Sequence, residues 1–130
     1  MSALPDDSTL AKLIGGGRVA FGVGCLLAPR LVTRTTPIPG DGPLVWMVRI
    51  FGVRDLVLGA GALQSMSSPN PDVSWVRMGA IADSLDVVTA LVFRKELGPS
   101  SLATTLAVAG PAAAGGWKAT LGLSKQAATA

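Results

Sequence analysis

Clusters of proline and glycine divide the chain into four apolar stretches, at residues 9–29, 44–63, 73–93 and 100–123. Each has about the 20 residues that an α-helix needs to cross the hydrocarbon core of a bilayer, which is about 30 Å thick. Polar and apolar residues do not alternate with a period of two, which disfavours strands. The pattern therefore predicts an all-α protein with a single domain at 1–130, folded as a four-helix transmembrane bundle.

The composition also favours a membrane protein. Hydrophobic residues make up 49% of the chain and charged residues only 15%, whereas a soluble domain carries roughly 25% charged residues. Trp46 and Trp75 open the second and third stretches, and Trp117 lies near the end of the fourth. Tryptophan at the end of a transmembrane helix is typical, because the lipid headgroup zone favours its amphipathic ring. We therefore expect the lipid bilayer to surround the bundle.

A soluble helical bundle is the alternative, because charged residues lie inside two of the stretches. Asp83 and Asp86 each cost about 2.5–3.5 kcal/mol in an inserted helix, more in total than the roughly 3 kcal/mol gained from their apolar neighbours. Arg49, Arg54 and Asp55 place a similar burden on 44–63. Neither segment is expected to insert alone, so the membrane interpretation requires helices that insert together.

These charges lie among small residues at helical spacing, where helix backbones can approach closely. One helix face is expected in each stretch, and only the fourth face lacks a charge. The faces consist of Gly15, Arg18, Gly22 and Cys25; Gly52, Asp55, Gly59 and Ala62; Gly79, Asp83, Asp86 and Ala90; and Ala103, Ala107, Gly110 and Ala114. The pattern predicts that the charges face neighbouring helices and not lipid.

Three arginines and three aspartates within the stretches form the candidate site: Arg18, Arg49, Arg54, Asp55, Asp83 and Asp86. An unpaired buried charge costs far more than a paired one, so the balance predicts an intramembrane network of interhelical Arg–Asp pairs. Arg54 lies about 200° around its helix from Gly52. We expect it to face another helix or another subunit, which favours a homo-oligomer or a complex with other membrane proteins.

The residue types argue against several functional classes. The chain has no histidine, and Cys25 is its only cysteine, which excludes the usual zinc sites and Ser-His or Cys-His pairs. The run GGGRVA at 15–20 fits a dinucleotide-binding pattern but lacks the preceding strand. Lys and Arg are spread along the chain, which argues against nucleic acid. We expect no catalytic residue, no metal and no cofactor, and we do not expect an enzyme.

Three segments carry a resemblance to a known family. They are Gly17-Arg18 with Gly22, Gly24 and Ala28-Pro29-Arg30; R-x-F-G-x-R-D-L-x-L-G at 49–59; and G-A-x-A-D-x-x-D at 79–86. Over most of its length the chain resembles small four-helix bacterial membrane proteins of the domain of unknown function 4267 type. The resemblance implies a multi-pass protein of the bacterial plasma (inner) membrane and implies no activity.

Two functions stay open at this point. The ion pairs can serve to fix helix register and partner choice, as in an accessory or interaction subunit of a membrane complex. Alternatively, Asp83 and Asp86 can carry a proton or bind a cation, as in a minimal proton- or cation-coupled transporter or an oligomeric channel, because ionisable residues inside a membrane are often functional.

Overall fold

A computed structural model describes residues 5–34 and 42–129. Within these ranges the chain forms only helices: α1 (Asp7–Leu27), α2 (Pro29–Arg34), α3 (Pro43–Met66), α4 (Ser74–Val92), α5 (Arg94–Leu97) and α6 (Pro99–Thr129). The all-α class is confirmed. The four long helices correspond to the four predicted ones, whereas α2 and α5 are short additions at the connections.

Local chemistry accounts for several helix ends. Asp6 caps α1, because its Oδ1 accepts a hydrogen bond from the Thr9 N–H at 3.0 Å, and this bond lowers the pKa of the Asp6 carboxyl. Pro29 ends α1, since the residue before a proline avoids the helical region. Gly98 joins α5 to α6 with φ of 78°, a conformation that glycine adopts without strain.

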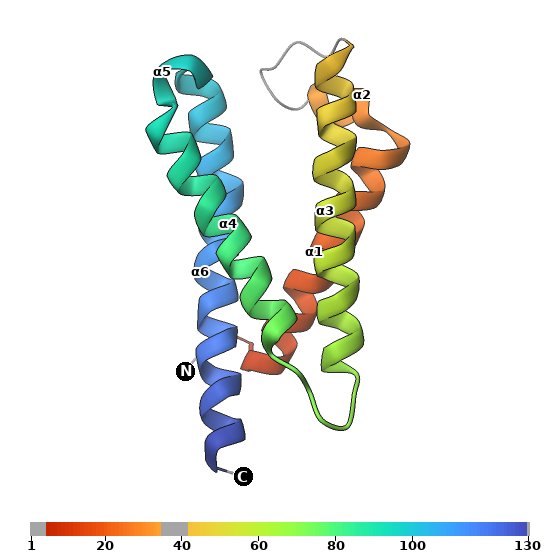
Figure 1. The fold of residues 1–130 in the computed structure, drawn as a ribbon, viewed down its shortest axis with the longest axis vertical. Coiled ribbons are helices and arrows are strands. Elements are labelled where there is room, and N and C mark those ends of the chain that lie inside the picture. The colour runs from red at the N-terminus through yellow and green to blue at the C-terminus, as the bar shows by residue number, and fades with distance from the viewer. Residues whose placement is uncertain (1–4, 35–41, 130) are drawn as a thin grey trace.

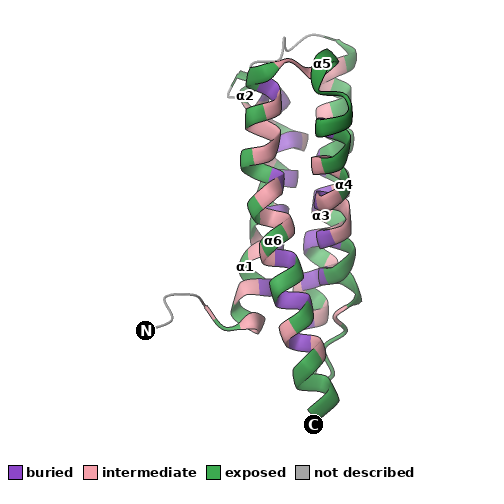
Figure 2. Cartoon of the chain, turned by 90° about the vertical axis from the view of Figure 1, so that its left-hand side faces the viewer, coloured by how far each residue is buried: buried purple, intermediate pink, exposed green. Residues whose placement is uncertain are grey.

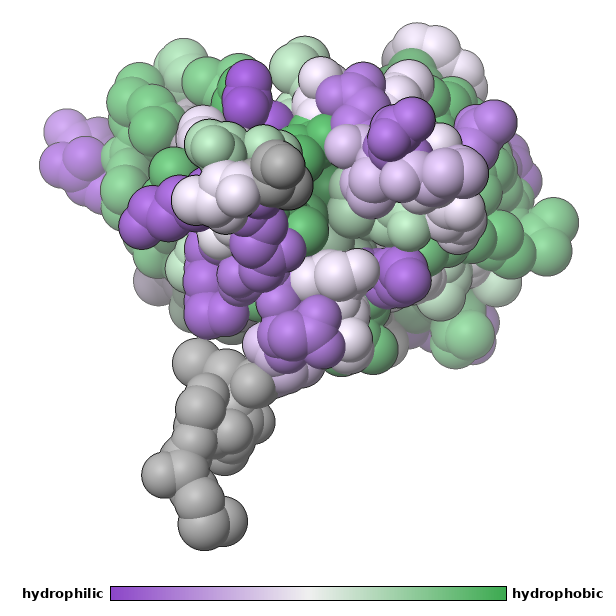
Figure 3. Space-filling model, turned by 90° about the horizontal axis from the view of Figure 1, so that it is seen from below, coloured by the Kyte–Doolittle hydropathy of each residue, from purple (hydrophilic) through white to green (hydrophobic). Residues whose placement is uncertain are grey.

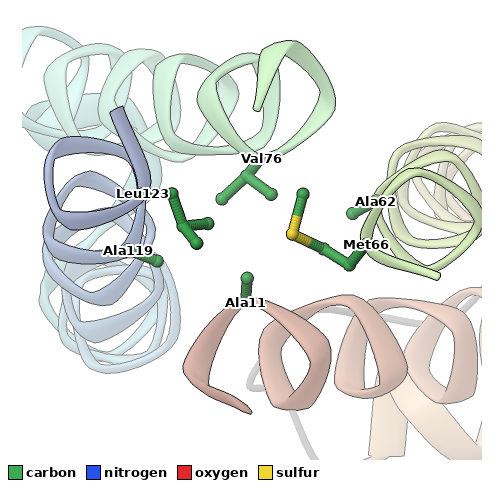
Figure 4. Close-up of a cluster of buried hydrophobic side chains, with 6 residues drawn as sticks. All are labelled: Ala11, Ala62, Met66, Val76, Ala119 and Leu123. Carbon is green, nitrogen blue, oxygen red and sulfur yellow. The ribbon is translucent and has the colours of Figure 1, made fainter. Parts of the chain in front are cut away.

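The four long helices form two pairs. α1 packs along α3 and α4 packs along α6, while contacts between the pairs are made by α1 with α6 and by α3 with α4. Figure 1 shows the pairs converging at the end where α1 begins and α6 ends, and diverging towards α2 and α5. At the convergent end, six buried hydrophobic side chains from all four helices meet (Figure 4): Ala11, Ala62, Met66, Val76, Ala119 and Leu123.

Buried residues lie on the facing sides of the helices (Figure 2). The predicted faces of α1 and α3 are confirmed in full, because every residue of both is buried. In α4, Gly79, Asp83 and Ala90 are buried and Asp86 is half-buried. Charges placed among small residues therefore identified three of the four packing faces.

The predicted face of α6 is wrong. Ala103, Ala107 and Ala114 are exposed and Gly110 is half-buried. The buried residues of α6 are instead Ser101, Ala109, Gly116, Ala119, Thr120 and Leu123. Small residues occur on every side of this helix, so their spacing does not identify one face.

Large hydrophobic side chains cover much of the outer surface. Leu27 is 81% exposed, Val92 64% and Trp46 63%. Among the described residues, Met66, Val76 and Leu123 are the only buried members of the large hydrophobic types Val, Ile, Leu, Met, Phe and Trp. Figure 3 shows the molecule from the convergent end, with hydrophobic residues on the flanks and many hydrophilic residues nearer the middle. The interior therefore consists mainly of small and charged side chains.

α1 is the one described helix that is long and apolar enough to cross a membrane by length and composition. The core helix of a soluble protein or an N-terminal signal sequence can meet the same criterion. α3 and α4 each contain three charged side chains: Arg49, Arg54 and Asp55, and Arg77, Asp83 and Asp86. Helix length and composition alone therefore do not support four membrane crossings or a multi-pass location in the plasma membrane.

Candidate functional site

Close packing of α1 on α3 places Arg18 opposite Asp55. A Cβ atom at Gly22 would lie 2.6 Å from the Gly52 carbonyl oxygen, and one at Gly59 would lie 2.6 Å from the Gly15 carbonyl oxygen. The helix backbones are thus in contact at two levels, each with a glycine on both sides. Arg18 and Asp55 lie between these levels in sequence, so the glycine contacts hold the two side chains together.

The Arg18 guanidinium joins three helices. Its Nη1 donates a hydrogen bond to Asp55 Oδ1 on α3, and its Nη2 donates to Asp83 Oδ2 on α4. The same Nη2 also donates to the Gly79 carbonyl oxygen at 2.9 Å. The side chains of Arg18, Asp55 and Asp83 are 9%, 9% and 7% exposed, so this part of the network is almost fully shielded from solvent.

Arg54 forms a second pair between α3 and α4. Its Nη1 and Nη2 donate to the two carboxylate oxygens of Asp86, at 2.9 Å and 2.7 Å. Arg54 Nη2 also lies 3.9 Å from Asp55 Oδ1, which links this pair to the Arg18 cluster. The expectation that Arg54 faces another helix is confirmed. Because the partner belongs to the same chain, Arg54 no longer requires a second subunit.

Arg49 does not join the network, contrary to the prediction. It is exposed on α3, and in the described ranges no carboxylate forms an ion pair with it. Arg49 precedes Asp55 by six residues, which places it about 120° away around the helix and more than one turn along it. The network therefore contains two arginines and three aspartates, so the expected balance of charge does not hold.

Two polar contacts outside the network were not predicted. Lys118 on α6 pairs with Asp7 at 3.0 Å. Trp117 Nε1 donates to Ser84 Oγ at 3.0 Å, and this hydroxyl donates to the Ala80 carbonyl oxygen. These contacts join residues 111 and 33 positions apart. No sequence signal identifies them, because many other polar residues lie at similar helix positions.

Two hollows adjoin the network. A cavity of about 10 Å³ lies beside Arg18, with Gly15, Gly79 and Gly116 among the residues that line it. This is the volume of about one water molecule by the same measure. An open groove of about 430 Å³ lies between α3 and α4. Apart from Arg54, its lining is apolar: Val53, Val57, Leu58, Met78, Ile81, Ala82 and Leu85.

The residues of this site can pair charges and exchange a proton. In the described part of the chain, no group of three or more His, Cys, Asp or Glu side chains could hold a metal ion. Arginine stays protonated at ordinary pH, so the aspartates are the groups of the network that can gain or lose a proton. The network can thus hold helices together or bind a proton.

Comparisons with family models, curated proteins and solved structures gave no match to the chain. The resemblance to the domain of unknown function 4267 type stays a prediction.

Proposed function

We propose that the four long helices cross a membrane and that the protein is an accessory or interaction subunit of a membrane complex. One observation carries the proposal: large hydrophobic side chains face outwards, while small and charged side chains face inwards. In a water-soluble bundle the large hydrophobic residues fill the core. In a bilayer they contact lipid, and small residues allow the helices to pack closely.

The charges in α3 and α4 are compatible with insertion, because most of them have partners inside the bundle. A criterion based on composition treats each helix as if it stood alone in lipid, where one charged residue costs about 2.5–3.5 kcal/mol of insertion free energy. Asp55, Asp83 and Asp86 each form an ion pair with an arginine of another helix. Pairing removes much of the cost of a buried charge. This favours insertion of the helices as a group.

The lengths of α3 and α4 and two of the three tryptophans support the same arrangement. At 1.5 Å per residue, the 24 residues of α3 and the 19 residues of α4 span about 36 Å and 28 Å, close to the hydrocarbon thickness of about 30 Å. Trp46 lies in the first turn of α3 at the divergent end, and Trp75 in the first turn of α4 at the convergent end. Two exposed tryptophans thus lie near opposite membrane surfaces.

A structural role suits the closed network better than transport. Arg18, Asp55 and Asp83 are nearly fully buried, and the cavity beside them has room for about one water molecule. The groove between α3 and α4 is mainly apolar. A network that is closed to water and holds the helices in register suits an accessory or interaction subunit better than a protein that moves ions.

Membrane integration is tested by fractionation. The protein should stay in the membrane pellet through alkaline carbonate and require detergent for extraction, because the apolar surface contacts lipid. A stable monomer in the soluble fraction would overturn the membrane proposal. The subunit role is tested separately: in mild detergent the particle should be larger than the 13.1 kDa chain plus its detergent, and a monodisperse monomer would count against it.

A minimal proton- or cation-coupled transporter is the second candidate, favoured by the excess of carboxylates over guanidinium groups in the network. It predicts that Asp83→Asn or Asp86→Asn abolishes flux in liposomes without changing assembly. If liposomes that contain the wild-type protein show no proton or cation flux, this candidate is rejected and the structural role remains.

A further inference from the structure

The network contains one more negative charge than positive charge. Its cations are Arg18 from α1 and Arg54 from α3, and its anions are Asp55 from α3 and Asp83 and Asp86 from α4. The other cations of the surrounding helices lie elsewhere. Lys12, Arg49, Arg77 and Lys125 are exposed, and Lys118 pairs with Asp7. No cation from the described residues compensates the third aspartate.

The two guanidinium groups are shared unequally among the three aspartates. Asp86 accepts a hydrogen bond from each terminal nitrogen of Arg54. Asp55 accepts one from Arg18 Nη1, and its Oδ1 also lies 3.9 Å from Arg54 Nη2. Asp83 receives only Arg18 Nη2, and that nitrogen also donates to the Gly79 carbonyl oxygen. Asp83 therefore has the least compensation of the three, although its side chain is only 7% exposed.

We infer that the network binds one proton at neutral pH and that the Asp83 carboxyl group holds it. Away from water, a carboxylate whose charge is not fully compensated by cations costs more than a neutral carboxyl group, so the surplus charge is relieved when a proton binds. The proton comes from water or buffer and forms one O–H bond on the carboxyl group. Two carboxylates then remain to balance the two guanidinium groups.

The local geometry has room for this proton. Asp83 Oδ2 accepts the hydrogen bond from Arg18, whereas Oδ1 accepts none from the described residues. The cavity beside Arg18 also touches Gly79, whose carbonyl oxygen shares Arg18 Nη2 with Asp83. That cavity has room for about one water molecule beside Arg18, the residue that donates to Asp83. The inference rests on the network alone and holds whether or not the protein transports anything.

The test measures protonated carboxyl groups directly. Infrared spectra of the purified protein in detergent at neutral pH should contain the C=O stretch of one buried, protonated carboxyl group. The band should shift in deuterated buffer and disappear in Asp83→Asn. It should remain in Asp72→Asn, a matched control in an exposed connection. Absence of the band from the wild type, or its loss in Asp86→Asn but not in Asp83→Asn, would overturn the assignment.

A second measurement needs no variant. The wild-type protein labelled with ¹³C at aspartate carboxyl groups should have one carboxyl resonance in the neutral form at a pH where exposed aspartates are ionised. All carboxyl resonances in the ionised form would overturn the inference, even if the Asp83 variant fails to fold. A neutral Asp83 found together with absent liposome flux would reject the transporter and leave the proton site established.

Discussion

Replacement of Arg18 by methionine is expected to cause the largest loss of stability of any single change in the network. Arg18→Met keeps a long, flexible side chain but removes three hydrogen bonds, those to Asp55, Asp83 and the Gly79 carbonyl oxygen. Asp55 is then a buried carboxylate whose nearest cation is Arg54, at 3.9 Å. Breaking a buried ion pair by removing one partner costs about 3–5 kcal/mol. This is a large part of a total stability of about 5–15 kcal/mol.

The free energy of unfolding is measured at equilibrium in mixed micelles, with tryptophan fluorescence as the readout. Arg49→Met is the matched control, because Arg49 is exposed and outside the network, and its cost should stay within about 0.5 kcal/mol. The triple variant Arg18→Met, Asp55→Leu and Asp83→Leu should recover much of the loss, since replacing a whole buried network with apolar residues is often neutral. Equal stability of Arg18→Met and Arg49→Met would refute the idea of a buried network.

Four further predictions concern helix packing and Arg54. Gly22→Ala should destabilise the fold by about 1–3 kcal/mol, because the new methyl group meets backbone atoms of α3. Gly24→Ala, with open space around it, should instead stabilise the fold by about 0.5–1 kcal/mol in the same unfolding assay. Gly61→Ala should displace the Trp75 ring, which a Cβ there would overlap, and shift the tryptophan emission; unchanged emission would contradict this contact. Arg54→Leu should cost about 1.5–3 kcal/mol through the loss of its charged hydrogen bonds, without changing particle size in mild detergent; a smaller particle would restore the argument that Arg54 contacts another subunit.

The sequence predicted the packing of α1, α3 and α4 because, in each helix, a charged residue shares one side with several small residues. A charge such as that of Arg18 or Asp55 is costly against lipid, and the glycines at seven-residue spacing on each side of them extend the same face. The sequence of α6 offers no such marker. Residues 99–117 contain no charge and many small residues, so Ala107 and Ala109 were equivalent in pattern, although only Ala109 is buried.

The sequence also identified five members of the network but not their pairing. Arg54 and Asp55 are adjacent and point about 100° apart, and only the positions of α1 and α4 around α3 explain why both are partly or fully buried. A helix with two neighbours has two packing faces, so a second charged face does not require a second subunit. The sequence places Arg49 in the network because it is an arginine in the same segment as Arg54. Its exposure in the structure depends on where α4 crosses α3, which the sequence does not reveal.

The residues that make α3 and α4 poor candidates for membrane spans are the residues that join them to α1. In water, the main stabilising force would come from burial of large apolar side chains, at about 25 cal/mol per Å², yet most of these side chains are outside this bundle. In lipid, helix association depends instead on close packing and on polar contacts between helices. The glycine contacts of α1 with α3 and the Arg18 and Arg54 pairs supply both. A criterion that tests each helix separately does not include this stabilisation, because the charge lies on one helix and its ion-pair partner lies on another.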